Sequence, residues 1–232
     1  MRNRKTANRG GSMVEFTLLI PIWLPLIVGT LWIGSSMIRD QAVTQMARDL
    51  ASMYSRDSTN LNFLNTDTTS STTTATNAAL NAVTGQIGSL DPATGTGVVF
   101  FSTITYVGNS FCAEAGNPAY GTLVPLSHTG ACTNYGSFVF TQQYVLGNTS
   151  LMAHSRFGTA SGPFDNADNI LPSDSVTASG NVANFTLIQP VPAETGSDGY
   201  QSGQRIYVVE VYFKNHGLAG YTGGGDYAYA VF

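Results

Sequence analysis

Charge is scarce in this sequence, and it is unevenly distributed. Charged residues make up 10% of the 232 residues, against about 25% in typical soluble domains. Residues 1–60 contain seven Lys or Arg and four Asp or Glu, whereas residues 61–232 contain three and ten. Because nucleic-acid affinity comes mainly from Lys and Arg that neutralise phosphates, we expect no nucleic-acid binding by the larger part. Its abundant Gly, Thr, Tyr and Phe instead favour a β-rich domain outside the cell.

Catalytic and metal-binding motifs are also missing. None of the motifs G-x-S-x-G, S-x-x-K, Walker A or G-x-G-x-x-G occurs where the flanking pattern would suit it. His128, His154 and His216 lie in separate segments without the spacing of a zinc site. The segment around Asp165 and Asp168 has oxygen ligands for Ca²⁺ but lacks EF-hand spacing, so it predicts a turn, and Ca²⁺ binding stays open. Apart from this open question about Ca²⁺, we expect a protein that is not an enzyme and has no cofactor and no metal site.

One long apolar segment stands out against this background. The stretch from Phe16 to Ile38 contains 23 residues without a charge. At about 1.5 Å per helical residue it is long enough to cross a hydrocarbon core of about 30 Å, and the sequence has no second run of that length. The residues before it include several bases and no acid: Arg2, Arg4, Lys5 and Arg9. The positive-inside rule predicts a single span, with a cytoplasmic N-terminus and an exported region after about Arg39.

A cleaved secretory signal peptide is the main alternative for this segment. Signal peptides also begin with basic residues, but their apolar region usually spans about 7–15 residues. The only small-residue sequence near the end of the run is Gly34-Ser35-Ser36, which is a poor cleavage site. The sequence therefore favours a retained membrane helix.

An acidic residue, Glu15, directly precedes the apolar run, where an ionisable group is costly and usually functional. Residues 9–16, RGGSMVEF, resemble the processing site of type IV prepilins, in which a short basic leader ends in Gly and a Glu is the fifth mature residue. This resemblance implies cleavage between Gly10 and Gly11, which makes Glu15 and Phe16 the fifth and sixth mature residues. Glu15 would then pair with the Gly11 α-amine of a neighbouring subunit, a desolvated pair whose disruption is strongly unfavourable.

A wider resemblance covers residues 9–56. The string GGSMVEFTLLIPIWLPLIVGTLWIG is similar to the N-terminus of TadE-like pseudopilins, minor pilins of the Tad (Flp, type IVc) pilus system, and residues 207–213, YVVEVYF, are similar to a late strand of that family. The resemblance implies a subunit that assists initiation or assembly of a pilus at the bacterial inner membrane. Its implied partners are sister pilins, the prepilin peptidase and the inner-membrane assembly platform. A membrane-anchored adhesive or binding module is the alternative.

The residues after the span predict a helical stalk and a second helix. Apolar residues recur at helical spacing beyond the span, so the membrane helix is expected to continue to about residue 56: Ile38, Ala42, Met46, Leu50 and Met53. Residues 57–76 are polar and rich in Ser and Thr, and they predict a linker. A stripe of Leu, Val and Ile then predicts a short helix over residues 75–89.

The sequence from residue 97 onward has the pattern of strands. Segments rich in β-branched and aromatic residues are separated by Gly, Pro, Asn and Asp: 98–107, 137–146, 182–188, 205–214 and 227–232. Strands that follow helices in this way predict an α+β fold with a largely antiparallel sheet. The expected organisation is a leader over residues 1–10, a membrane and stalk helix over 11–56, a linker over 57–76 and a head domain over 77–232.

The chain has two cysteines, Cys112 and Cys132, and both lie in the region expected to be exported. Conditions outside the cytoplasm favour disulfides, so we expect these two residues to be joined. Closing the loop between them would stabilise the head by about 3 kcal/mol. Redox and metal roles are not expected for two thiols so far apart in the sequence.

Overall fold

The computed structural model describes residues 11–56, 88–108, 111–112, 132–162, 164, 169–185, 202–214 and 224–232. One long helix, α1 (Gly11–Arg56), precedes a four-stranded sheet. The other elements follow in chain order: β1 (Gly97–Tyr106), β2 (Phe138–Gly147), α4 (Pro172–Thr177), the 3-10 helix η3 (Ser179–Asn181), β3 (Arg205–Phe213) and β4 (Asp226–Val231). A long N-terminal helix followed by an antiparallel sheet confirms the expected α+β class.

The chain is divided into two compact units. Residues up to Gln41 belong to the first, and residues from Ala42 to Phe232 form the second, called the head below. α1 therefore contributes to both units. Its residues 42–56, called the stalk below, are part of the head.

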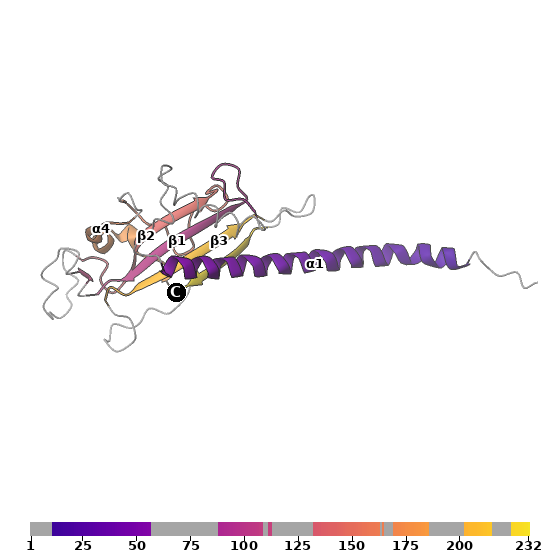
Figure 1. Cartoon of the computed structure of the whole chain (residues 1–232), viewed down its shortest axis with the longest axis horizontal. Helices are drawn as coiled ribbons and strands as arrows, with labels where there is room; N and C mark the ends of the chain where they lie inside the picture. The colour runs from indigo at the N-terminus through magenta and orange to yellow at the C-terminus, as the bar shows by residue number, and fades with distance from the viewer. Residues whose placement is uncertain are drawn as a thin grey trace, which may run out of the picture. The chain divides into compact units, whose positions relative to one another are not determined.

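The head is built on an antiparallel sheet with strand order β2-β1-β3-β4 (Figure 1). The central strand β1 pairs with β2 on one side and with β3 on the other. β4 extends the sheet beyond β3, with Val208 opposite Val231 and Phe213 opposite Asp226. β1 is buried along almost its whole length, because both faces of the sheet are covered.

The stalk covers one face of the sheet. The spacing between its buried side chains alternates between three residues and one residue: Val43, Met46, Ala47, Leu50, Ala51 and Tyr54. They share a core with Phe101, Val211 and Phe213 of the sheet. The predicted continuation of the helix to about residue 56 is confirmed. Of the residues that predicted it, Met46 and Leu50 are buried against the sheet, whereas Ala42 is half-buried and Met53 is exposed. Steps of four residues overshoot a turn of about 3.6 residues, so a strict four-residue stripe drifts away from the sheet.

A second layer, formed by described residues between 155 and 185, covers the opposite face. Its buried side chains pack with strand residues of that face: Phe157, Ala160, Ile170, Ala183 and Phe185 with Ile104, Phe138, Phe140, Ile206 and Val208. An irregularity in the β1–β2 pairing lies at Thr103 and Ile104, which pair with Gln142 and Phe140. The extra residue, Thr141, reverses the alternation of β2. Phe138 and Phe140 therefore face the second layer, whereas Tyr144 faces the stalk.

The strand predictions are confirmed at four segments and wrong at the fifth. β1 to β4 lie within one or two residues of the predicted segments 98–107, 137–146, 205–214 and 227–232. The described part of segment 182–188 is not a strand. Val182 makes an isolated bridge to Val139 at the edge of β2, directly after η3. A high β-propensity yields a strand only where a partner runs alongside, and the edge of β2 accepts only short contacts here.

Several predicted segments lie outside the described residues: the leader, the linker over 57–76, the possible Ca²⁺ segment at Asp165 and Asp168, and most of the helix over 75–89. Gly88 and Ser89, at the end of that predicted helix, are not helical. The short helix α4 was not predicted. Pro172 occupies its first turn, where the missing N–H of proline costs nothing.

Candidate functional site

The first candidate site is the beginning of α1. Gly10 lies outside the described residues, and the helix begins at Gly11. Glu15 follows within the second turn, and its side chain is exposed. No charged residue occurs between Glu15 and Arg39. The structure therefore places the predicted pairing residue on the surface of the helix, where the apolar run begins.

An apolar hollow runs along one face of this part of α1. Its lining residues are three, four or seven positions apart, as expected for a single helix face: Phe16, Leu19, Ile20, Trp23, Leu24 and Ile27. Glu15 lies at the margin of this face, because Leu19, one of the lining residues, follows it by four positions. The beginning of α1 thus presents a carboxylate beside a row of large apolar side chains.

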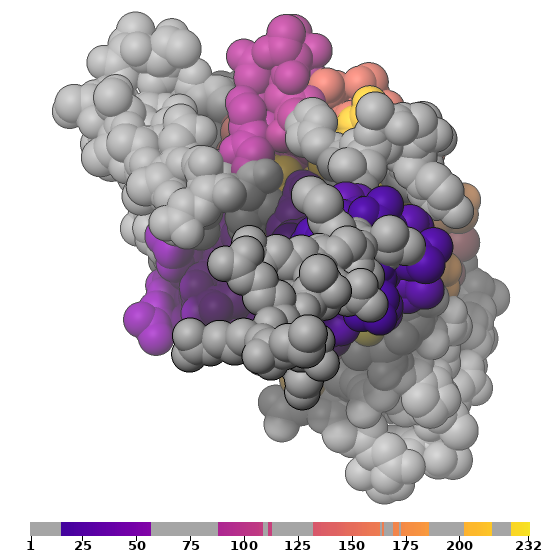
Figure 2. Space-filling model, turned by 90° about the vertical axis from the view of Figure 1, so that its right-hand side faces the viewer, coloured from indigo at the N-terminus to yellow at the C-terminus, as the bar shows by residue number. Residues whose placement is uncertain are grey.

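The large apolar side chains of the uncharged segment are open to the surface. From Phe16 to Ile38 they are between 41 and 69% exposed, and Figure 2 shows indigo atoms of α1 at the surface of the molecule. Within the described part of the chain, α1 is the one helix long and apolar enough to cross a membrane. Exposed apolar surface of this extent needs lipid or another protein to cover it.

The second candidate site is the junction between the stalk and the sheet. Tyr54, near the end of α1, is completely buried, and its hydroxyl lies 2.7 Å from Thr103 Oγ1 of β1. The same hydroxyl donates to Gln142 Oε1 of β2 at 3.1 Å. The ring meets Phe101 and Tyr207 edge to face, each with centroids 5.5 Å apart. These contacts attach the end of the stalk to three neighbouring strands.

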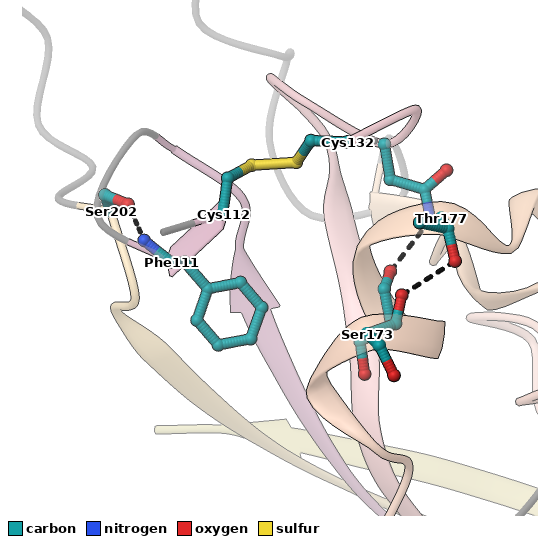
Figure 3. Close-up of a disulfide and its surroundings, with 8 residues drawn as sticks. Phe111, Cys112, Cys132, Ser173, Thr177 and Ser202 are labelled. Atoms are coloured by element: carbon teal, nitrogen blue, oxygen red, sulfur yellow. Dashed lines mark hydrogen bonds between the residues drawn. A yellow bond between two sulfur atoms is a disulfide. The ribbon is translucent and has the colours of Figure 1, made fainter. Parts of the chain in front are cut away.

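The predicted disulfide is present and lies beside α4 (Figure 3). Cys112 and Cys132 are buried, with their Cα atoms 6.1 Å apart. The backbone N–H of Phe111 donates to Ser202 Oγ at 3.0 Å, which ties this segment to the chain that leads into β3. The bridge therefore joins the segment after β1 to the segment before β2, at the same end of the sheet as the start of β3.

Asn134 connects the disulfide region to α4. Its side-chain amide donates to the carbonyl oxygens of Ser175 and Ala178, both at 2.8 Å. Its backbone N–H donates to the carbonyl of Val176 at 2.9 Å. These donors satisfy carbonyls at the end of α4 that have no partner within so short a helix. The region is therefore a structural unit built around the disulfide.

A third cluster surrounds Glu210, in the middle of β3. This carboxylate is 1% exposed and lies on the sheet face opposite the stalk. It accepts hydrogen bonds from Ser155 Oγ, from the backbone N–H of Arg156 at 2.9 Å and from the Tyr227 hydroxyl at 2.6 Å. The Arg156 guanidinium lies 3.8 Å from the centre of the Tyr227 ring. Glu210 thus connects β3, β4 and the second layer.

Two of the three donors to Glu210, Ser155 Oγ and the Arg156 N–H, come from a tight turn. Gly158 N–H donates to the Ser155 carbonyl at 3.1 Å, and Gly158 has a φ of 119°, which L residues with a side chain rarely adopt. Burial raises the pKa of the Glu210 carboxyl above its ordinary value, although the hydrogen bonds of Ser155, Tyr227 and Arg156 act in the opposite direction. The carboxyl is thus held by neutral donors in a largely dry site.

Sequence reasoning missed the roles of Tyr54 and Glu210. Glu210 had a visible signal, because it is the one charged residue within the apolar string YVVEVYF. A lone acid in a strand that is otherwise apolar is either exposed on one face or buried with partners. Tyr54 had no comparable signal. Its partners Thr103 and Gln142 lie far away in the sequence, and Thr and Gln are residue types that usually occur on protein surfaces.

No group of three or more His, Cys, Asp or Glu residues that could hold a metal ion occurs in the described part of the chain. His154 is exposed, and its Nδ1 lies 3.1 Å from Thr159 Oγ1. Comparison of the chain with protein-family models, with curated proteins and with solved structures finds no match. The function of this protein is therefore inferred from its own sequence and structure.

Proposed function

We propose that this protein is a TadE-like minor pilin or pseudopilin that takes part in the assembly or initiation of a type IVc (Tad/Flp) pilus. In this proposal it is not an enzyme. It spans the bacterial inner membrane once, with its N-terminus in the cytoplasm and its head outside. Its partners are the prepilin peptidase, which removes residues 1–10, the sister pilins and the inner-membrane assembly platform.

The observation that carries this proposal is the construction of α1. The helix begins at Gly11, carries an acid at Glu15, continues through 23 residues without a charge, and ends in a stalk whose side chains form part of the core of the head. A simple membrane anchor needs only the apolar segment. A helix that is both the apolar segment and a core element of the head suits a subunit that assembles through its helix.

The beginning of α1 offers two complementary contacts for a neighbouring helix. The exposed face from Phe16 to Ile27 can pack against apolar side chains of a sister subunit. The Glu15 carboxylate can accept a hydrogen bond from the α-amine that processing creates at Gly11 of a neighbouring subunit. Each contact favours a particular stagger between subunits, because the carboxylate must reach the amine while the apolar faces meet.

The first experiment compares Glu15→Leu with Glu15→Asp, which keeps the charge. If Glu15 pairs with a neighbour's amine, Glu15→Leu leaves membrane content unchanged but costs about 3–5 kcal/mol at each subunit contact. We expect crosslinking to sister pilins and the number of surface fibres to fall sharply, and Glu15→Asp to retain part of both. N-terminal sequencing of the mature protein should begin at Gly11.

Two results would contradict the proposal. A mature N-terminus at Met1 or near Met37 would mean that the leader is not a prepilin leader. Normal crosslinking and normal fibres in Glu15→Leu would mean that the acid only marks the membrane boundary, and the anchored adhesive module would then be the better explanation.

A further inference from the structure

The two edges of the sheet differ in how their backbone groups are satisfied. At the β2 edge, the N–H of Ile170 donates to the Thr141 carbonyl at 2.9 Å, and the N–H of Ala183 donates to the Phe138 carbonyl at 2.8 Å. Further bridges join Gln142 to Asn169 and Val139 to Val182. Segments of the second layer therefore cover this edge.

The β4 edge has no such cover among the described residues. Phe232 and Tyr207 exchange both backbone hydrogen bonds, at 2.8 and 2.9 Å, so alternate residues of β4 face β3. In an antiparallel ladder the residues in between, Tyr227, Tyr229 and Val231, direct their N–H and C=O groups away from β3. No described residue pairs with these outward groups.

β4 also lacks the features that usually protect an edge strand. Natural edges are shielded by lysine, proline, a bulge or a covering segment. The sequence of β4, DYAYAV, has no lysine or proline, and its pairing with β3 is regular. The Tyr229 side chain is 47% exposed, and Phe232 just beyond the strand is 54% exposed. The edge is therefore open and partly apolar, with one charge at its beginning.

We propose that the β4 edge binds an edge strand of a sister subunit, so that the two heads share one continuous antiparallel sheet. An extended strand is the partner that such an edge selects, because only a strand presents donors and acceptors at the matching spacing. The inference rests on the proposed pilin function for the source of that strand.

The topology of the head determines which strand the partner presents. β4 and β1 run in the same direction, since each is antiparallel to β3, and β2 runs opposite to both. The stalk runs in the direction of β1 (Figure 1). A sister subunit of this architecture with a parallel stalk, as a common membrane requires, therefore meets β4 with the strand equivalent to β2, and the two strands are antiparallel.

A second copy of this chain cannot offer both an open edge strand and a parallel stalk. Its own β2 edge is occupied by residues 169–170 and 182–183. Antiparallel pairing of β4 with another β4 requires a twofold axis perpendicular to the sheet, which reverses one stalk relative to the other. The partner is therefore a different sister subunit. This chain can extend a row of heads at β4 but ends the row at β2, as a capping subunit would.

The test places a photo-crosslinking residue at the edge, Tyr229→p-benzoylphenylalanine, in cells that produce the whole set of sister subunits. The expected product is one adduct whose peptide maps to a strand of another single-span, prepilin-type subunit. Val231→Pro in the same background should abolish this adduct. Val231 directs its N–H away from β3, so proline blocks the edge without removing a bond within the head.

Val231→Thr is the matched control, because it keeps the N–H and should keep the adduct. Equal thermal unfolding of the three proteins verifies that the head is intact. An adduct with a second copy of this chain, no adduct, or an adduct that survives Val231→Pro would each overturn the inference. Processing at Gly10 and the Glu15 phenotype are measured separately. If the adduct forms but the leader is not removed at Gly10 and Glu15→Leu has no effect, only the pilin function is rejected. If the leader is removed and Glu15→Leu impairs assembly but no adduct forms, only the edge pairing is rejected.

Discussion

The two halves of α1 have the same backbone conformation and opposite side-chain environments. Before Gln41 the large apolar side chains are exposed, as at Leu24, which is 59% exposed. In the stalk, Leu50 is 1% exposed and Tyr54 is completely buried. The conformation of a helix therefore does not determine whether it lies in a membrane or in a domain core. What covers its side chains decides this.

The sequence of each half corresponds to its environment. Between Phe16 and Ile38 the first half has no charge, and its large apolar side chains are exposed on all sides, as expected for a segment that lipid or another protein covers. This segment also contains Pro21 and Pro25. The stalk has no proline and carries charges on its exposed side, including Arg48 and Asp49. It is apolar only on the side that meets the sheet. The following changes test this contrast, beginning with the largest expected effect.

Truncation of one leucine in each half should separate the two environments most clearly. Leu50→Ala removes side-chain volume from a buried core and should lower the free energy of unfolding of the head by about 2–5 kcal/mol. Leu24→Ala removes the same atoms from an exposed position and should leave head unfolding unchanged. Thermal unfolding of the full-length protein in detergent measures both. Equal effects of the two changes would contradict the division of α1 into an exposed half and a core half.

Loss of the disulfide should affect the head and not the span. The double change Cys112→Ser with Cys132→Ser should lower the free energy of unfolding of the head by about 3 kcal/mol, because the unfolded chain regains the freedom of a closed loop. Membrane content should remain the same, since the bridge lies far from α1 in the sequence. Unfolding in denaturant, with and without reductant, gives the value. If reductant alters the double mutant as much as the wild type, the effect does not come from this bridge.

The strands could be predicted from the sequence because their signal is local. β-branched and aromatic residues fill segments such as VVFFSTITY and RIYVVEVYF, and glycine, asparagine or aspartate separates them. The disulfide was also predictable, because two cysteines in a domain that is expected to be exported leave one pairing. The edge contacts of β2 were not predictable. Val182 lies in a segment of strand-like composition, and only its place beside Val139 makes it a single bridge.

The candidate site was predictable at one end of α1 and not at the other. Glu15 is conspicuous, because it is a charged residue directly before a long apolar run. The stalk contact of Tyr54 depends on a bulge at Thr141, which places Gln142 on the same sheet face as Thr103. A bulge leaves no clear signal in a single sequence. The partners of Glu210 likewise come from residues 155–156 and 227.

The polar contact at the end of the stalk should have a smaller effect than its apolar core. Tyr54→Phe keeps the ring and removes the hydroxyl, so that Thr103 and Gln142 lose a buried partner. We expect the free energy of unfolding to fall by about 1–3 kcal/mol, because Thr103 Oγ1 and Gln142 Oε1 lose a close hydrogen-bond partner at a buried site, while the contact between them is long, at 3.4 Å. Adding Gln142→Leu and Thr103→Val to Tyr54→Phe should recover part of this loss. No recovery would mean that the hydroxyl acts through the packing of the ring.

The smallest expected effect concerns the sheet face that the stalk does not cover. Glu210→Gln keeps the shape of the side chain and an acceptor for Arg156 or Tyr227, but it does not titrate. Because burial raises the pKa of Glu210, the folded head binds this proton more tightly than the unfolded chain. Its contribution to stability is therefore complete below the unfolded pKa of about 4.3 and is lost as the pH rises through the folded value.

The wild type should accordingly lose stability relative to Glu210→Gln as the pH rises from about 4 towards neutrality. For one proton the difference changes by at most about 1.4 kcal/mol per pH unit. Denaturant unfolding of both proteins at each pH measures it, and the difference between the two cancels the other titrating groups. A wild type that gains stability relative to Glu210→Gln over this range would show that the three donors outweigh burial. The carboxylate would then stabilise the attachment of the second layer to the sheet in its charged form.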